Sequence, residues 1–279
     1  MPDESAVTVV TIAHGRHDHL VRQREVLREV AAGVPHVVVA MEDPEIGRLL
    51  EGDPDVVLRE VPADALGLPL AAARNLGVAT AIDEGAELVV LLDVDCLPGP
   101  DLLRRYAEAA RAAPGDMLCG PVTYLAAGVR PTRAAELTAL TSPHPARPAP
   151  PDDQVVRTAD HDLFWSLSFA VTPATWARVG GFCEEYVGYG GEDTDLAWSA
   201  RDRGVGLCWV GGAHAYHQWH PVSAPPVEHL QDIVRNARIA HRRWGRWPMS
   251  GWLTAFAERG LIRWEGNDVK VLRDPPSPD

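Results

Sequence analysis

The stretch ELVVLLDVDCLP, residues 87–98, carries the strongest structural signal in the chain. Its run of valine and leucine predicts a strand that is buried on both faces, which is typical of a parallel sheet. Similar apolar runs at residues 6–12 and 36–41 predict two more strands of this kind. The three runs therefore predict the core of one buried sheet.

Helical signals alternate with these strands. Residues 17–32, 70–82 and 100–113 predict helices, and Gly33 is placed to end the first of them. Repeated strand–helix units predict an α/β fold with a mainly parallel, doubly wound sheet. In such folds ligands bind at the carboxyl ends of the strands.

The second half of the chain is less regular. Residues 126–151 are rich in proline and alanine and show no periodicity, which predicts a mobile loop or crossover. Helices are expected after the Thr172-Pro173 pair, at residues 194–203 and at residues 227–243. We expect the tryptophan-rich stretch that follows to pack on the domain rather than form a domain of its own.

The composition is that of an ordinary globular protein. Of 279 residues, 46% are hydrophobic and 23% are charged, and the net charge of −13 disfavours binding to nucleic acid. The four cysteines form no C-x-x-C pair, which favours reduced thiols. No apolar run approaches the roughly 20 residues of a membrane span, and the acidic N-terminus is unlike a signal peptide. We therefore expect no transmembrane segment and a cytoplasmic protein.

Two aspartates follow the apolar run of residues 88–92. Alternation along an extended chain would place Asp93 and Asp95 on the same side of the strand. Two such carboxylates repel each other unless a cation lies between them or one binds a proton. Hard divalent cations are often bound by carboxylates of the protein and by phosphates of the substrate at the same time. The pair therefore indicates a metal site, with simple capping of the following turn as the alternative.

The stretch YGGEDTD, residues 189–195, combines two glycines with three acids. Glycines permit a tight backbone and the close approach of a ligand. Helix capping by Thr194 or Asp193 would explain one or two of the acids, because acids are favoured at the start of a helix. It leaves the glycine pair and the aromatic Tyr189 unexplained. A carboxylate on a glycine turn beside an aromatic ring suits a general base under a stacked sugar.

Three histidines lie three residues apart at positions 214, 217 and 220. Imidazole is the commonest transition-metal ligand, so we expect at least one of them to bind metal. We rank His217 first, His220 close behind and His214 third. If the stretch is extended, residues three apart point to opposite sides, and one of the leading pair would be the direct ligand. A mixed carboxylate and imidazole set favours Mn²⁺ over Mg²⁺.

These stretches, in this order, resemble nucleotide-sugar glycosyltransferases of the GT-A fold. The likeness is to family 2 enzymes and to the C-terminal domain of β-1,4-galactosyltransferases and chondroitin-type polymerases. Residues 93–98 resemble the metal-binding D-x-D strand end, and residues 74–77, RNLG, are similar to the R-N-x-G helix. Residues 180–195 are similar to the G-G-F…G-G-E-D-x-D acceptor and base motif. Residues 11–20 resemble the loop that contacts the nucleotide.

The resemblance implies a role for each matching residue. Asp193 would be the catalytic base, and Glu192 and Tyr189 would bind the acceptor. The metal would be held directly by Asp95, with Asp93 assisting and His217 or His220 completing the site. The residues implied to contact the nucleotide sugar are Thr11, Ala13, His14, Arg16, Arg74, Asp93, Val94, Gly190 and Gly191.

The activity implied is that of an inverting, metal-dependent hexosyltransferase. It would use Mn²⁺ or Mg²⁺ to move a sugar from a nucleoside diphosphate sugar, above all a UDP-sugar, to a hydroxyl of a glycan or small-molecule natural product. A homodimer is left open. The main alternative is a non-catalytic nucleotide-sugar-binding or scaffold protein. A sugar nucleotidyltransferase would need a glycine-rich loop where residues 11–19 hold one glycine.

The resemblance also implies a division of the chain. Residues 1–222 would form a single GT-A catalytic domain. Residues 1–115 would be its nucleotide-binding half, and residues 116–222 its acceptor-binding half with a mobile loop around 126–160. Residues 223–279 would form a helical, tryptophan-rich C-terminal extension.

Overall fold

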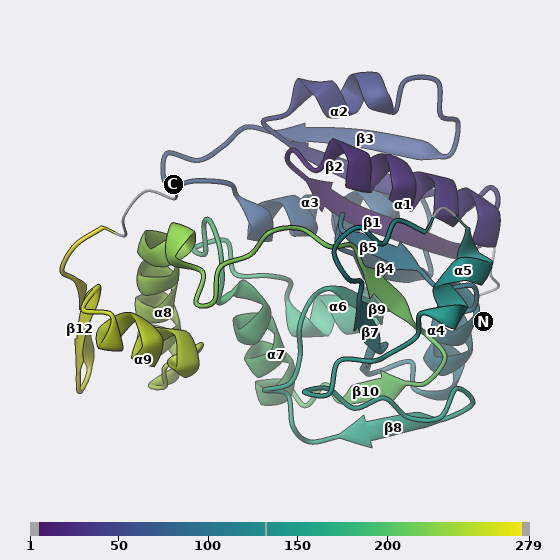
Figure 1. Ribbon diagram of the computed structural model, residues 1–279. Helices are drawn as coiled ribbons and strands as arrows, with labels where there is room; N and C mark the ends of the chain where they lie inside the picture. Colours follow the sequence, from purple (N-terminus) through teal and green to yellow (C-terminus); the bar gives the residue numbers. More distant parts are fainter. Residues whose placement is uncertain (1–5, 132, 275–279) are drawn as a thin grey trace.

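The computed structural model of the chain describes residues 6–131 and 133–274. Within these ranges eight strands form one sheet in the order β3-β2-β1-β4-β9-β6-β10-β8. Helices cover both faces of this sheet, and the C-terminal part of the chain lies at one end of it (Figure 1). The predicted α/β architecture is confirmed.

The first half of the sheet is parallel. β1 pairs in parallel with β2 and with β4, and β2 pairs in parallel with β3. The apolar runs of the sequence form β1, β2 and β4, and every residue of these three strands is buried. β3 lies at the edge and has no such run. The bounds are Val7–Ala13 for β1, His36–Met41 for β2, Val56–Val61 for β3 and Leu88–Leu92 for β4.

The second half of the sheet is mixed. β9 runs antiparallel to both β4 and β6, whereas β6 and β10 are parallel. β8 then pairs antiparallel to β10 at the other edge. The sheet is thus mainly parallel, with two antiparallel insertions from the second half of the chain. The bounds are Met117–Cys119 for β6, Val155–Thr158 for β8, Ser168–Val171 for β9 and Leu207–Val210 for β10.

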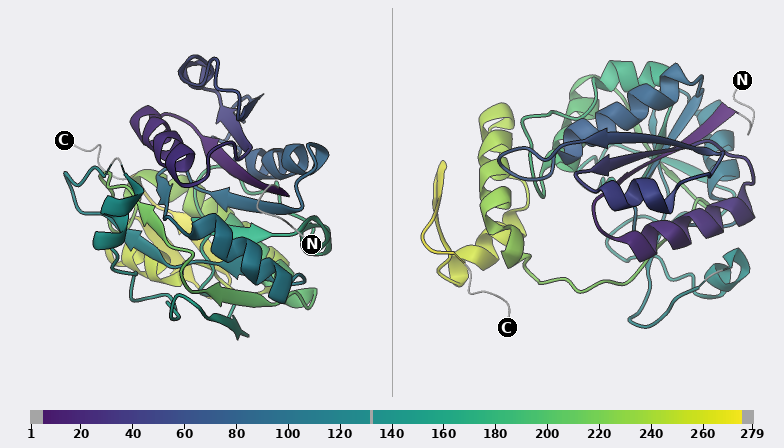
Figure 2. Two further views of the ribbon diagram at one scale, coloured as in Figure 1. Left: turned by 90° about the vertical axis from the view of Figure 1, so that its right-hand side faces the viewer. Right: turned by 90° about the horizontal axis from the view of Figure 1, so that it is seen from above.

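Two hydrophobic clusters hold the helices to the sheet. One cluster joins alanines of α3 and α7 to valines of β1 and β2, and the other joins α1 and α4 to the opposite sheet face. Figure 2 shows this layering of helix, sheet and helix from the side and from above. The bounds are His17–Val30 for α1, Pro44–Leu49 for α2, Leu70–Asp83 for α3, Leu102–Ala112 for α4, Pro173–Val179 for α6 and Glu192–Asp202 for α7.

A second, three-stranded sheet lies next to the carboxyl end of β4. Its order is β5-β11-β7, with β11 antiparallel to β5 and parallel to β7. β5 (Cys96–Pro98) follows β4 after a short turn, and β11 (Ala215–His217) comes from far along the chain, as does β7 (Val122–Tyr124). This small sheet brings the histidine segment beside the aspartates.

The segment around 126–160 is more ordered than the sequence predicts. It contains α5 (Ala134–Ala139) and the edge strand β8. The sequence does not reveal either element. α5 is short, and β8 is largely exposed and shows no apolar alternation. Mobility of this segment upon ligand binding stays a prediction.

The C-terminal extension has a hydrophobic core of its own. Side chains of α8, α9 and a two-stranded hairpin form this cluster, which includes Ile233, Leu253, Phe256 and Val269. The hairpin β12–β13 is absent from the sequence prediction, which expected helices alone. The bounds are Val227–His229 for the 3₁₀ turn η2, Leu230–Trp244 for α8, Ser250–Glu258 for α9, Ile262–Glu265 for β12 and Asp268–Val271 for β13.

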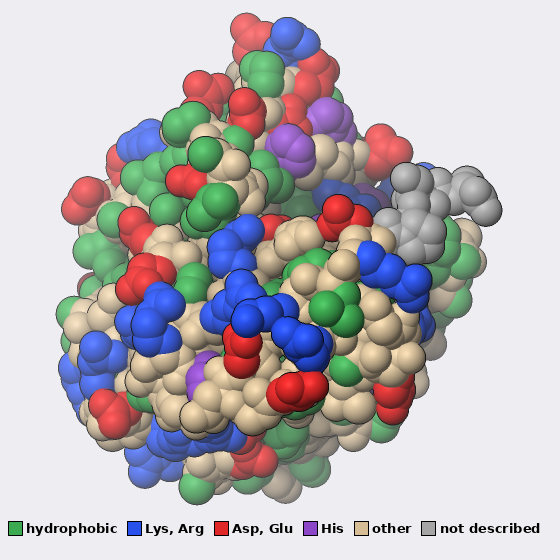
Figure 3. Space-filling view, turned by 90° about the vertical axis from the view of Figure 1, so that its left-hand side faces the viewer, with side chains coloured by type: hydrophobic (Ala, Val, Ile, Leu, Met, Phe, Trp, Pro, Cys, Tyr) green, Lys and Arg blue, Asp and Glu red, His purple; other side chains and the backbone are tan. Residues whose placement is uncertain are grey.

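The extension also binds the loop that leads into the YGGEDTD stretch, residues 187–190. The side-chain amide of Asn236 on α8 donates hydrogen bonds to the carbonyl groups of Val187 and Gly190, at 3.1 and 2.8 Å. Asp232 accepts a hydrogen bond from the backbone N–H of Tyr189 at 3.2 Å. Figure 3 looks onto the face that carries the extension, where basic side chains gather in the centre. The extension therefore helps to fix the loop before α7.

Asp195 is the centre of this contact. Its buried carboxylate accepts hydrogen bonds from the Tyr186 hydroxyl at 3.1 Å, from Arg243 at 2.8 Å and from the Trp244 indole at 2.6 Å. Two of these donors belong to α8. The last acid of the YGGEDTD stretch is therefore a structural residue that docks the extension.

We expect Asp195→Ala to lower the free energy of unfolding by about 3 kcal/mol, because it leaves a buried hydroxyl and a partly buried guanidinium without their acceptor. Asp202→Ala at the exposed end of the same helix is the matched control, with an expected change within about 0.5 kcal/mol. Chemical denaturation of both variants measures the difference. Equal stabilities of the two variants would contradict the docking role.

Candidate active site

The two aspartates lie at the carboxyl end of β4. The strand ends at Leu92, and the Asp93 carbonyl accepts a hydrogen bond from the Cys96 N–H at 2.8 Å, which closes a turn. Asp93 and Asp95 therefore belong to the turn before β5 and not to the strand itself, as extended alternation would require. The side-chain amide of Gln23 on α1 fixes this turn by donating to the carbonyls of Asp93 and Cys96, both at 2.8 Å.

Asp95 forms a triad with two histidines. Its Oδ2 atom lies 3.4 Å from His217 Nε2 and 3.3 Å from His220 Nε2. The ligand atoms of the three residues lie within 4.8 Å of one another, a spacing that one metal ion can bridge. Burial would raise the pKa of Asp95, but hydrogen bonds from both histidines outweigh burial and hold that pKa far below its usual range.

Both leading histidines lie beside Asp95, so the geometry leaves room for both of them, and not one alone, to be direct metal ligands. β11 places His217 opposite Cys96, and the strand ends there. Beyond the strand, the Gln218 N–H donates to the Asp95 carbonyl at 2.6 Å and the Gln218 side chain accepts from Arg22, also at 2.6 Å. These contacts hold the segment after β11 beside the aspartates, where His220 Nε2 also reaches Asp95.

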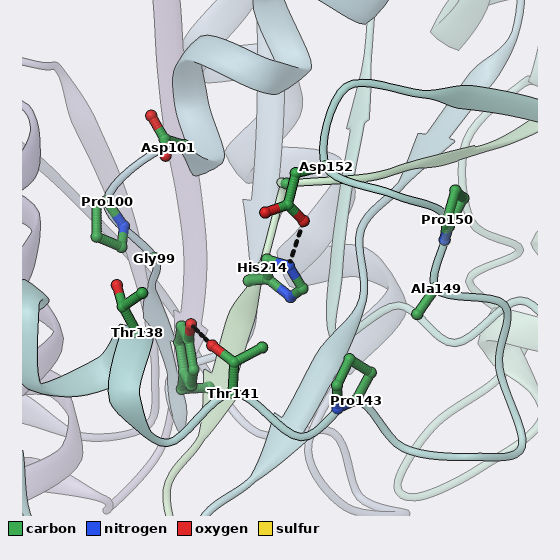
Figure 4. Close-up of a pocket in the computed structure, with 12 residues that line it drawn as sticks. Gly99, Pro100, Asp101, Thr138, Thr141, Pro143, Ala149, Pro150, Asp152 and His214 are labelled. Atoms are coloured by element: carbon green, nitrogen blue, oxygen red, sulfur yellow. Dashed lines mark hydrogen bonds and ion pairs between the residues drawn. The ribbon is translucent and has the colours of Figure 1, made fainter.

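His214 lies away from the triad, in agreement with its third rank. Its Nε2 atom pairs with the Asp152 carboxylate at 3.1 Å. Figure 4 shows this pair in the wall of a separate cavity of about 350 Å³, next to the hydrogen bond between Thr141 and Tyr216. Since neighbouring residues of a strand point to opposite faces, Tyr216 lines this cavity while His217 faces Asp95.

Arg74 joins the two acidic clusters. Its guanidinium donates to Asp93 and to Glu192, each at 3.1 Å, and only 5% of the residue is exposed. Burial would lower the pKa of Arg74, but the charges of Asp93 and Glu192 raise it further above its usual range. The second oxygen of Glu192, Oε2, is buried and has no partner among the described residues. The R-N-x-G and G-G-E-D stretches thus meet through one ion-pair bridge.

Asp193 has the ionisation expected of a base near neutral pH. Burial and the neighbouring charge of Glu192 raise the pKa of Asp193 to about 7. One carboxylate oxygen accepts a hydrogen bond from the Thr194 N–H at 2.6 Å. The helix begins earlier than predicted, since Gly191 and not Thr194 or Asp193 is the N-cap of α7. Gly190 and Gly191 permit this early start, because both have φ near +90°.

Tyr189 stands beside this carboxylate in an aromatic stack. Its ring lies 4.4 Å from the His229 ring and 5.9 Å from the Trp252 ring, with interplanar angles of 21° and 27°. Tyr189 is 39% exposed. Burial and the charges of Asp193 and Glu192 raise its phenol pKa above the usual range. His229 and Trp252 come from the C-terminal extension, and sequence reasoning missed both.

The residues predicted to contact the nucleotide lie near the triad but differ in exposure. Thr11 is buried, and its hydroxyl donates to the Leu92 carbonyl at 2.9 Å. Arg16 is exposed, and one of its nitrogens lies 3.2 Å from His220 Nδ1. The Nδ1 atom of His14 lies 2.7 Å from the Met41 carbonyl oxygen. Ala13 and Val94 are both buried.

Asp43 is a further residue at this edge that the sequence did not mark. It accepts hydrogen bonds from the Gly15 N–H at 2.7 Å and from His17 at 2.8 Å, and thereby holds the loop after β1. Both this acid and Gln23 act through contacts between segments distant in sequence. No local motif identifies such residues.

Comparisons with known proteins point to glycosyltransferases. Residues 158–220 match the family model described as the N-terminal domain of galactosyltransferase. Two curated relatives, both named validoxylamine A glucosyltransferase, come from Streptomyces hygroscopicus subsp. jinggangensis (strain 5008) and subsp. limoneus. Each is 28% identical over 179 residues, or 53% of this chain. The match covers only 39% and 36% of the length of these relatives.

Two solved structures share the fold at 12% identity. A crystal structure of GalNAc-T7 with UDP, GalNAc and Mn²⁺ has a TM-score of 0.57 and covers 85% of this chain and 47% of that one. A crystal structure of S. aureus TarS 1-349 has a TM-score of 0.54, with 91% and 70% covered. None of the helices in the described ranges is both long and apolar enough to span a membrane. The chain therefore has the GT-A fold and is a relative of glycosyltransferases.

Proposed function

We propose that this chain is an inverting, metal-dependent glycosyltransferase. It transfers a sugar from a nucleoside diphosphate sugar to an acceptor hydroxyl. The observation that carries this proposal is the Arg74 bridge, which links Asp93 beside the metal triad to Glu192 beside Asp193. A metal-type cluster and a base-type carboxylate then border one site, as a transfer between donor and acceptor requires.

The triad fits a divalent metal ion. One carboxylate and two imidazoles are a borderline set of ligands, which suits Mn²⁺ better than Mg²⁺. His217 is held in place by stacking on Tyr124 at 4.5 Å, and His220 by its contact with Arg16. When bound, a divalent cation supplies a Lewis acid that offsets the charge developing on the departing diphosphate.

The protein residues perform the proton transfer and the positioning. Asp193 accepts the proton of the acceptor hydroxyl as that oxygen attacks the anomeric carbon. Glu192 is held by Arg74 with one oxygen free, so it can accept a hydrogen bond from the acceptor. The ring of Tyr189 offers a flat apolar face on which a sugar ring can stack. A single displacement with one base inverts the anomeric centre.

The names of the similar proteins support the choice of substrates. The GalNAc-T7 structure contains UDP and Mn²⁺, which favours a UDP-sugar donor here. The curated relatives are named validoxylamine A glucosyltransferase, which favours glucose as the transferred sugar and validoxylamine A as the first acceptor to test. A thermal-shift assay with UDP-glucose tests the donor. The melting temperature should rise when Mn²⁺ and UDP-glucose are present together, and it should not change with UDP-glucose and a chelator.

The raised pKa of Asp193 predicts an acidic limb in the pH–rate profile. The base is active only when ionised, and its pKa lies at about 7. Below that pH we expect kcat/KM to fall about tenfold per pH unit, because the protonated carboxyl cannot accept a proton. Steady-state rates between pH 5 and pH 9 measure this limb. A profile that stays flat down to pH 5 would contradict the assignment.

A further inference from the structure

Arg147 is a buried cation without a counterion. Only 5% of the residue is exposed. Its three side-chain nitrogens, Nε, Nη1 and Nη2, are all buried and have no hydrogen-bond partner in the described part of the chain. A charged group in such surroundings is strongly unfavourable unless it is paired and hydrogen-bonded. The positive charge of Arg147 is therefore neither paired with an acid nor hydrogen-bonded in the described part of the chain.

Two tryptophans enclose the guanidinium. Its central carbon lies 5.3 Å from the centre of the Trp165 ring and 5.0 Å from the centre of the Trp209 ring. Cation–π contact offsets part of the cost of burial. However, the indole Nε1 of Trp209 is itself buried and without a partner among residues 6–131 and 133–274. Four hydrogen-bonding nitrogens thus lie on neighbouring side chains, and none of them has an acceptor.

The charge of Arg147 acts on the surrounding core. Burial raises the pKa of the Cys119 thiol to about 12, and the Arg147 charge opposes that rise. Cys119 is a neutral thiol under ordinary conditions, so it does not compensate the guanidinium. No acid of the described ranges forms an ion pair with Arg147. A group that stabilises the buried guanidinium would need a negative charge and atoms that accept hydrogen bonds.

We propose that Arg147, Trp165 and Trp209, here called the Arg147 cluster, bind an oxyanion, either a carboxylate or a phosphate group. Guanidinium presents its N–H donors in a planar fork that matches two oxygens of such a group. The Trp209 N–H supplies a further donor, and the flanking rings exclude water. A water molecule could accept these hydrogen bonds but would leave the charge uncompensated.

The Arg147 cluster lies close to the proposed active site. Aromatic contacts run from His217 to Tyr124 at 4.5 Å, to His144 at 5.4 Å and to Trp165 at 5.3 Å. Arg147 follows His144 in a tight turn, with its N–H donating to the His144 carbonyl at 3.1 Å. Because of this proximity, the oxyanion can be the carboxylate of an acidic sugar, such as the uronate of a donor, and this source rests on the proposed function. The other source is a free anion from solution.

Melting temperatures in chloride-free buffer test the proposal. Inorganic phosphate or acetate, near 100 times its dissociation constant, should raise the melting temperature of the wild type by about 5 °C. Arg147→Met should melt higher than the wild type in the absence of anions, because the unpaired charge is gone, and should not respond to them. Arg130→Met, an exposed residue of the same region, is the matched control and should respond as the wild type does.

A second arm compares UDP-glucuronic acid with UDP-glucose, each in the presence of Mn²⁺. If UDP-glucuronic acid raises the melting temperature of the wild type more than UDP-glucose does, and Arg147→Met loses this difference, the occupant is a sugar carboxylate. That result also supports binding at the Arg147 cluster. Equal response of wild type and Arg147→Met to every anion would overturn the proposal. So would a wild type whose melting temperature is the same with phosphate, acetate and both nucleotide sugars. This last result needs no variant to fold.

Discussion

Replacing Asp193 with asparagine is expected to lower turnover by about 100-fold or more. A positioned general base typically contributes 10²–10⁴-fold, and the amide cannot accept the acceptor proton. The substitution keeps the side chain's size and its oxygen toward the Thr194 N–H, so folding should hardly change. Donor affinity should persist, because the carboxylate lies on the acceptor side of the Arg74 bridge.

The control for this variant is Asp202→Asn on the exposed end of α7, which should keep wild-type turnover. Initial rates at saturating donor compare the two. Wild-type turnover in Asp193→Asn would mean that this residue only shapes the start of α7. Glu192, with its free buried oxygen, would then become the candidate base.

Replacing Asp95 with alanine is expected to weaken Mn²⁺-dependent binding of UDP-glucose by about 100-fold or more. Residues that merely support a metal ligand already contribute 10–100-fold to metal affinity, and Asp95 would be a direct ligand. Without the cation, the remaining carboxylate and the diphosphate repel each other. Calorimetric titration with and without Mn²⁺ measures the loss.

The histidines refine this test. His217→Ala and His220→Ala should each weaken Mn²⁺ binding, because both imidazoles lie within 3.4 Å of Asp95. His214→Ala is the matched control, since that ring pairs with Asp152 in a separate cavity. Unchanged donor affinity in Asp95→Ala, or equal small effects of all three histidine variants, would show that the triad does not hold the metal.

Local pattern predicted the framework of the fold. The strand at residues 36–41 was predicted with both of its ends, because a continuous run of buried residues between turns leaves little ambiguity. β3 and β8 were missed for the opposite reason: both are edge strands without a fully buried residue, and their apolar runs stop after three and two residues. The hairpin β12–β13 was missed because each of its strands is only four residues long and carries few buried side chains.

The candidate site divides in the same way. Asp93, Asp95 and Asp193 could be singled out because a fold seldom needs several acids at the end of a buried strand or beside a glycine pair. The convergence of His217 and His220 could not, since it depends on the contacts of Gln218 with Arg22 and with the Asp95 carbonyl, both of which are distant in sequence. The stack of His229 and Trp252 on Tyr189 depends on how α8 and α9 dock, which residues distant in sequence decide.

Release of UDP from UDP-sugars, with and without Mn²⁺, tests the central claim most directly. The reaction contains the full chain and validoxylamine A, the acceptor in the names of the curated relatives. We predict release that requires Mn²⁺, stops with chelator, and is lost in both Asp95→Ala and Asp193→Asn. Tight metal-dependent binding of the donor without any release would instead identify a nucleotide-sugar-binding protein and contradict the proposed enzyme.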